Sequence, residues 1–414
     1  MASSDLYRAI AIPDFRLLFF GGMAASFAMN MQIVARGWLI YELTQSELDL
    51  ALVSLAFLLP TVLFSLWGGL LADRYSKRRL IVIGQGMNTV ATFVMAFIVL
   101  SENVTFWHFM GFGFFNGTVL ALSMPARQAF VPELVPDRLI LSATSLNSTG
   151  WNFARIVGPS FAGLLIAWIA HGDKQSHFGV GIVYLIISAL YATSALTVGR
   201  LSKSGETHPA NGNALREMRD AFAYIRARPP ILGLIVLGII PFMFGMPINT
   251  LMPAFSHDVI GGGPDDLGYL ISAMGAGAIV GSLVTGSLGN LERKGFWLVC
   301  TGLGWGAMTI AFGLSPSLGA AFIAILLIGF LSSTTTSLNR SLLQMQVDRH
   351  MRGKVLSIDM MSQGLMPIGL LPISFVAEQT SVAVALTVSG GLFLGLILAC
   401  LTFVPAVRVV QRTL

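Results

Sequence analysis

The strongest constraint on this chain is a series of apolar runs, each long enough to cross a lipid bilayer as a helix. A transmembrane helix needs about 20 mostly apolar residues, and six such runs come before residue 200 and six after residue 230. They cover residues 15–41, 48–72, 80–100, 105–124, 140–170, 179–199, 231–255, 267–290, 296–314, 318–338, 355–377 and 381–404. This pattern predicts an all-α integral membrane protein with twelve transmembrane helices.

Composition agrees with a bilayer as the main solvent. Of the 414 residues, 55% are hydrophobic and 11% are charged, and the mean hydropathy is +0.76. A soluble domain carries about 25% charged residues, so this chain has too few polar side chains to cover a water-facing surface. We expect membrane lipids around it. The N-terminal stretch lacks the layout of a signal peptide, which predicts that the first apolar run is a retained helix.

One polar interval divides the chain into two halves. Residues 201–230 form the long hydrophilic stretch between an N-terminal bundle, 1–200, and a C-terminal bundle, 231–414. Within the interval, NALREMRDAFAYIRARPP predicts a short amphipathic helix that ends at Pro229 and Pro230. This helix lies either on the membrane surface or in solvent as part of a linker, and the sequence leaves both open.

Basic residues between the apolar runs predict the orientation in the membrane. With the N-terminus inside, the inner segments hold 22 of the 25 Lys and Arg residues, the outer loops hold Lys174, and Arg36 and Arg155 lie within apolar runs. An excess of basic residues marks cytoplasmic loops. We therefore expect both termini in the cytoplasm and the protein in a bacterial-type cytoplasmic membrane. The same distribution explains the net charge of +5 without a nucleic-acid partner.

Two inner loops resemble each other and predict an internal repeat. SMPARQAFVPELVPDRL follows the fourth run and SLNRSLLQMQVDRHMRG follows the tenth, so that Arg127 matches Arg340. Parallel halves are one of the repeat layouts of secondary transporters. The repeat therefore predicts two pseudo-symmetric bundles of six helices each.

The stretch GGLLADRYSKRR, between the second and third runs, resembles the loop signature of the major facilitator superfamily, Gly-x-Leu-x-Asp-Arg-x-Gly-Arg-Arg. Ser76 stands where glycine is usual. The residues that match the signature are Gly69, Leu71, Asp73, Arg74, Lys77 and Arg78. The resemblance implies the major facilitator fold and transport by alternating access.

Three further stretches resemble the drug and siderophore efflux branch of that superfamily, which includes enterobactin-exporter-like proteins. They are WLIYELTQSELDLALV, MPARQAFVPELVP and LNSTGWNFARIVGP. The resemblance implies a monomeric, ion-coupled exporter, with the proton as the expected ion, no cofactor and an amphipathic drug or siderophore as substrate. A lipid or lysolipid flippase of the same fold is the alternative.

An enzyme is not expected. The six histidines form no HExxH or similar arrangement, Cys300 and Cys400 have no metal-ligand spacing, and no GxxxxGK[ST] loop occurs. We therefore predict no catalytic centre, no metal site and no ATP-driven pump.

The loop signature predicts a gate. Gly69 is expected to allow a close approach between helices, and Asp73 can face the positive N-terminal end of another helix. By resemblance, that helix is the eleventh, which starts near Arg352. Alternatively, the basic residues of the loop only mark the inner face of the membrane.

Two strips of small residues predict tight helix packing. One on the fifth run comprises Gly150, Ala154, Gly158 and Ala162 with Pro159 beside it, and one on the eighth comprises Gly277, Gly281, Thr285 and Gly289. We expect the two strips to pack against each other between the halves. Packing inside one bundle is the alternative.

Polar residues within the spans predict a substrate cavity, because charged groups there face the bundle interior or water. Arg155 follows Asn147 and Trp151 at helical spacing, and its alternative role is a structural bond to backbone carbonyls. Three prolines around Asn249 predict a bent seventh helix. The predicted cavity residues are Asn30, Gln32, Arg36, Asn147, Trp151, Arg155, Met243, Asn249, Met360 and Gln363.

Asp359, early in the eleventh run, is the clearest acidic residue inside a span. We predict it as a candidate proton carrier, with Asp49 as the next choice. A fixed salt bridge between Asp359 and Arg340 or Arg352 is the alternative.

Overall fold

The computed structural model describes residues 2–170, 177–205, 219, 222–287, 294–348, 351, 355, 358–359 and 362–403. Within these residues the secondary structure is helical and no strand occurs. The chain forms two compact units. The first comprises Met1–Gln45, Leu52–Asn211 and Gly263–Gly268, and the second comprises Ser46–Ala51, Gly212–Gly262 and Tyr269–Leu414.

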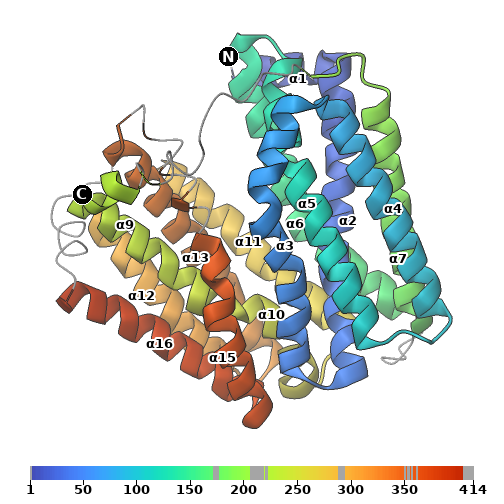
Figure 1. The fold of residues 1–414 in the computed structure, drawn as a ribbon. Coiled ribbons are helices and arrows are strands. Elements are labelled where there is room, and N and C mark those ends of the chain that lie inside the picture. The colour runs from blue at the N-terminus through green and yellow to red at the C-terminus, as the bar shows by residue number, and fades with distance from the viewer. Residues whose placement is uncertain are drawn as a thin grey trace. The chain divides into compact units, whose positions relative to one another are not determined.

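The first unit is built on six long helices that run alongside one another (Figure 1). Helix α2 packs against α6 and α7, and α4 packs against α5 and α7. A short helix, α1, precedes α2 and contacts α6. The elements are α1 (Ala2–Ala11), α2 (Pro13–Thr44), α3 (Glu47–Arg74), α4 (Lys77–Leu100), α5 (Phe106–Leu134), η1 (Asp137–Leu139), α6 (Ile140–Ile169) and α7 (His177–Gly199).

Local sequence signals set the helix ends of this unit. Pro13 occupies the first turn of α2, where its missing N–H would have no partner. The helix ends at Gln45, which adopts the left-handed conformation of a C-cap (φ 48°). Ser76 caps α4 by accepting a hydrogen bond from the Arg79 backbone N–H. These caps set the ends of helices, which hydropathy alone would leave undefined.

Glycines bring α3 and α5 into direct backbone contact. A Cβ at Gly68 would clash with the Ala121 carbonyl, and a Cβ at Gly117 would clash with the Phe57 carbonyl. Lipid does not drive apolar helices together, so close backbone approach and the resulting dispersion contacts stabilise the pair instead. The two crossings fix α3 against α5 and so position Phe57, which becomes important below.

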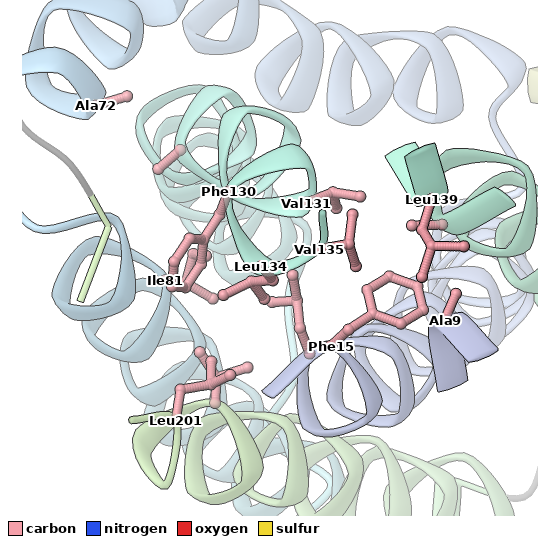
Figure 2. Close-up of a cluster of buried hydrophobic side chains, with 14 residues drawn as sticks. Ala9, Phe15, Ala72, Ile81, Phe130, Val131, Leu134, Val135, Leu139 and Leu201 are labelled. Carbon is pink, nitrogen blue, oxygen red and sulfur yellow. The ribbon is translucent and has the colours of Figure 1, made fainter. Parts of the chain in front are cut away.

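One end of the first unit is closed by an apolar cluster to which α1 contributes (Figure 2). Phe130 and Leu134 of α5 lie near Ile81 of α4, while Phe15 lies beside Leu139. The whole cluster comprises Ala9, Phe15, Leu18, Ala72, Ile81, Ala126, Phe130, Val131, Leu134, Val135, Leu139, Ala143, Val198 and Leu201. Helix α1 was not expected from the apolar runs, because only one of its faces is apolar and it is too short to span.

The segment 201–205, which follows α7, is held on this same end. The Asp14 carboxylate accepts hydrogen bonds from the backbone N–H groups of Ser202 (3.0 Å) and Lys203 (3.1 Å). Arg78 donates to the Leu201 carbonyl, and Ser76 donates to that of Ser204 at 2.8 Å. Gly205 has a φ of 87°, which a residue with a Cβ rarely adopts. We call these contacts the linker clamp.

The second unit contains the remaining helices. Helix α12 packs against α13 and α16, α15 packs against α16, and α9 packs against α13. Its elements are α9 (Pro229–Ile240), η2 (Pro241–Gly245), α10 (Pro247–Ala254), η3 (Phe255–Val259), α11 (Pro264–Ser287), α12 (Lys294–Gly313), α13 (Leu318–Gln346), η4 (Ser362–Leu365), α15 (Met366–Gln379) and α16 (Val382–Phe403).

Two π-helical turns, η2 and η3, interrupt the seventh predicted helix at its prolines. Within them Met246 N–H donates to the Pro241 carbonyl, and Ile260 N–H donates to that of Phe255, each across five residues. Proline cannot donate, so carbonyls near it need other partners. The Phe244 carbonyl accepts from Ser389 Oγ at 2.7 Å. The irregular backbone is therefore satisfied inside the protein rather than exposed to lipid.

Eleven helices among the described residues are long and apolar enough to span a membrane. The twelfth expected span, 355–377, is described only in part, so that a count of twelve stays a prediction. The ends also differ: α5 reaches Leu134 instead of 124, and α13 reaches Gln346 instead of 338. These helices continue past the hydrocarbon-length run because amphipathic turns extend them. The expected linker helix lies largely outside the described residues.

Candidate functional site

A polar cavity of about 120 Å³ lies inside the first unit. Helices α2, α3, α4, α5 and α7 all contribute to its wall. One side chain carries a full charge, and several others can form hydrogen bonds. The lining residues are Met29, Gln32, Ile33, Arg36, Phe57, Asn88, Asn116, Leu120 and Tyr191. We call this space the Arg36 cavity.

Arg36 is the charged group of this cavity. Its guanidinium carbon lies 5.4 Å from the centre of the Phe57 ring, within the range of a cation–π contact. Among the described residues, no carboxylate forms an ion pair with Arg36, and no acceptor forms a hydrogen bond with it. The arginine is therefore positioned by an aromatic ring and keeps its N–H donors available.

Amide side chains surround the arginine. Tyr191 donates to Gln32 Oε1 at 3.4 Å, which leaves the two N–H donors of the Gln32 amide available. Asn116 donates to the Phe112 carbonyl at 3.0 Å and presents its own oxygen as an acceptor. Asn88 is buried, and its Oδ1 has no hydrogen-bond partner among the described residues. An amide at such a position is expected to meet a ligand or water, because buried polar groups rarely stay unpaired.

The predicted cavity residues of the first unit separate into two groups. Gln32 and Arg36 line the Arg36 cavity, whereas the Asn30 amide donates back to the Ser26 carbonyl at 2.8 Å. Asn147, Trp151 and Arg155 lie on α6 and do not line this cavity, and Arg155 is exposed. Sequence reasoning missed Phe57, Asn88, Asn116 and Tyr191. Asn88 and Asn116 gave a usable signal, because each is an amide within an apolar run.

A smaller polar space, about 20 Å³, lies in the second unit. This is the volume of a single water molecule. Here Arg340 Nε lies 3.9 Å from Asp359 Oδ2, and the carboxylate is 6% exposed. The lining residues are Leu237, Gly238, Pro241, Phe242, Thr335, Thr336, Asn339, Arg340 and Asp359. We call it the Asp359 cavity. The Arg340 contact is the pairing that the sequence left open as an alternative for Asp359.

The other predicted residues of the second unit lie elsewhere. The Met243 carbonyl faces Gly369, where a Cβ would clash with it. Asn249 donates to the Met246 carbonyl at 3.3 Å, so that its amide folds onto its own helix. Gln363 lies in η4, and Met360 lies outside the described residues.

The loop signature makes its described contacts within the first unit. Lys77 is buried and forms an ion pair with Glu133 at 2.8 Å, and Arg78 belongs to the linker clamp. Arg74 is exposed. The side chain of Asp73 lies outside the described residues, so its predicted partner is not tested. Among the described residues, a Cβ at Gly69 would meet nothing within 4 Å, whereas one at Gly68, about 100° away around the helix, would clash with the Ala121 carbonyl. Arg352, near which the expected partner helix starts, lies outside the described residues, so the close approach predicted at Gly69 stays a prediction.

The four glycines of the two strips that the structure describes each face a helix of their own unit. Gly150 and Gly158 lie against α2, next to Phe19, Met23 and Asn30, while Gly277 and Gly281 lie against α13. Ala154 and Ala162 of the first strip are fully buried. Beside Pro159, Ser160 Oγ donates to the Gly268 carbonyl at 3.2 Å within the first unit. The glycine contacts match the alternative of packing inside one bundle. A direct contact between the two strips stays a prediction.

Comparison with known proteins places this geometry in a transporter framework. The family model described as transmembrane secretion effector matches residues 6–412. The staphyloferrin A transporter of Staphylococcus aureus is 24% identical over 90% of both chains. The macrolide efflux protein A of Streptococcus pyogenes is 24% identical over 87% of this chain and 88% of its own length. The enterobactin exporter EntS of Shigella boydii is 25% identical over 70% of this chain and 67% of its own length.

Solved structures show the same fold at low sequence identity. The nucleoside transporter NupG has a TM-score of 0.76 at 12% identity and covers 94% of this chain and 99% of its own. A bacterial homologue of the human lysosomal transporter Spinster has a TM-score of 0.71 at 14% identity and covers 97% of this chain and 96% of its own. The chain is thus a multi-pass membrane transporter of the bacterial inner-membrane type rather than an enzyme. It belongs to the transmembrane secretion effector family, within the siderophore and drug efflux branch of the major facilitator superfamily.

Proposed function

We propose that this protein is an ion-coupled exporter that moves an amphipathic drug or siderophore by alternating access. The observation that carries the proposal is the Arg36 cavity, which places an arginine inside a transporter bundle with no ion-pair partner among the described residues. Relatives named for macrolide efflux and enterobactin export support the direction of transport. Gln32, Arg36, Asn88, Asn116 and Tyr191 form one part of the substrate site. Asn147, Trp151 and Arg155 on α6 extend it.

The Asp359 cavity supports a role in ion coupling. Burial disfavours an ionised carboxylate, while a neighbouring arginine favours it, and Arg340 lies at 3.9 Å, too far for a short hydrogen-bonded pair. A movement of either helix can therefore shift the balance between a charged and a protonated Asp359. The proposed coupling ion is the proton. Asp359 carries it, and Arg340 releases it because a nearby guanidinium favours the ionised carboxylate.

The function is tested with inside-out vesicles from cells that express the protein. Staphyloferrin A, enterobactin and a macrolide are offered separately while a pH gradient is imposed, with vesicles that lack the protein as the control. We expect gradient-dependent accumulation of at least one compound and its loss with a protonophore. Movement of a labelled lipid, without accumulation of any of the three, would replace the proposal by a flippase.

We further propose that Asp73 helps to hold the cytoplasmic side closed. The test uses a single cysteine in place of Ser145, an exposed residue near the start of α6, with Cys300 and Cys400 changed to serine. Asp73→Asn should increase its labelling rate from the cytoplasmic side, whereas the matched change Arg79→Gln should not. Equal labelling rates in all variants would show that Asp73 does not hold the cytoplasmic side closed. The basic residues of the loop would then only mark the inner face of the membrane.

A further inference from the structure

The geometry points to an anionic group on the substrate: we propose that the Arg36 cavity binds a carboxylate. This inference rests on the proposed function only for the statement that the bound molecule is exported. The binding itself follows from the side chains of the first unit. It narrows the proposed substrates to molecules that carry a carboxylate.

The charge balance of the first unit favours an anion. Arg36, Arg127 and Arg155 lie within its long helices, and none of them forms an ion pair among the described residues. At the clamped end of the unit, Glu133 pairs with Lys77, and the Asp14 carboxylate accepts hydrogen bonds from backbone N–H groups. A cation within a membrane-spanning helix is costly when it has no counter-ion. A negatively charged ligand removes that cost.

The donor groups of the cavity match a carboxylate. The guanidinium offers a planar fork that binds two carboxylate oxygens at once. Gln32 Oε1 accepts from Tyr191, which directs its amide donors away from that bond. The Asn88 amide can present N–H donors after a half-turn about its terminal torsion, because its oxygen has no partner to lose. No carboxylate lines the cavity to repel the ligand.

The size of the cavity restricts what part of a substrate enters. Sites that enclose a drug-sized ligand measure about 300–1,000 Å³, whereas this cavity measures about 120 Å³. It therefore accommodates one head group. Phe57, Ile33, Met29 and Leu120 supply the apolar part of the wall, against which a ring or short chain beside the carboxylate can pack.

The experiment compares benzoate with benzamide, two probes of similar shape that differ in charge. Thermal unfolding of the purified full-length protein in detergent is followed over a concentration series of each probe, because a ligand that binds the native state raises Tm. We expect benzoate to raise the Tm of the parent and benzamide to have little effect. Arg36→Gln should weaken benzoate binding about tenfold or more, and Arg36→Lys should retain part of it.

The matched control is Arg16→Gln, which makes the same change at an exposed position of the same helix and should leave the benzoate response unchanged. The Tm of each variant without probe shows whether it is folded. If benzamide stabilises the parent as well as benzoate does, or if folded Arg36→Gln keeps the full benzoate response, the proposal is wrong.

This result is separable from the proposed function. Benzoate binding that depends on Arg36, with no accumulation of any compound in vesicles, would leave the anion site intact and remove the exporter. If the parent exports a compound under a gradient and the Arg36→Gln variant exports it equally well, the exporter proposal stands and the anion site is removed.

Discussion

The two units each contain a polar cavity with one arginine, yet the two arginines have different surroundings. Arg340 in the second unit faces the Asp359 carboxylate at 3.9 Å, and the space beside them holds about one water. Arg36 in the first unit faces an aromatic ring and amides, in a space about six times larger. An arginine beside a carboxylate of the protein can change the protonation state of that carboxylate. An arginine without such a carboxylate can bind the anionic group of a ligand. This difference agrees with the proposal that the second unit contributes to ion coupling and the first unit binds the charged part of the substrate.

The largest expected effect comes from removing the internal counter-ion. Asp359→Asn should abolish substrate accumulation driven by a pH gradient while exchange between equal substrate pools continues, because a neutral amide cannot carry a proton. The measurement is vesicle transport under both conditions. Asp348→Asn is the control, since it breaks an ion pair with Arg228 that is largely exposed. Full proton-driven accumulation in Asp359→Asn would leave the Asp359–Arg340 contact as a fixed structural pair.

A second prediction compares the removal of two matched amides, one from each cavity. Asn88 and Asn339 each line one cavity, and each has a buried Oδ1 without a hydrogen-bond partner among the described residues. Asn88→Leu should weaken benzoate binding about tenfold, because a hydrogen bond to a charged group contributes roughly 1.5–3 kcal/mol. Asn339→Leu should leave benzoate binding unchanged. Equal losses in both variants, measured by Tm shift, would remove the distinction between the cavities.

The smallest effect is expected from the aromatic ring that supports Arg36. Phe57→Leu keeps an apolar side chain but removes the cation–π contact, which contributes about 0.5–1 kcal/mol at partly exposed sites. Benzoate affinity, measured by Tm shift, should fall about two- to fivefold. Phe153→Leu, at an exposed ring on α6, is the control and should have no effect. A larger loss than this would mean that Phe57 contacts the anion itself.

Much of the fold follows from the sequence, because helix length and apolar content are local properties. The eleven described spans coincide with predicted runs. Two π-helical turns interrupt the helix around Asn249, and the bend predicted there stays a prediction. Helix α1 and the linker clamp could not be predicted. The first is too short and one-sided for a hydropathy pattern, and the second joins residues 188 positions apart.

Fewer residues of the candidate site could be predicted from the sequence, because helix geometry decides which side chains meet. Arg36 and Gln32 stand out as polar residues in an apolar run, and both line a cavity. Which polar residues meet them depends on helix crossing and rotation, so Tyr191 and Phe57 gave no signal. Helix rotation also determines the contacts of Asn30, whose amide donates a hydrogen bond to the Ser26 carbonyl. Helix rotation likewise turns Gly68, and not the adjacent Gly69, toward the Ala121 carbonyl.

The linker clamp has a consequence for the order in which the chain folds during synthesis. Asp14 leaves the ribosome early, but its backbone partners, Ser202 and Lys203, are made only after all the helices of the first unit. Domains fold as units, N-terminal first, while the rest of the chain is still being made. The hydrogen bonds of Asp14 in the linker clamp can thus form only after residue 203 has emerged.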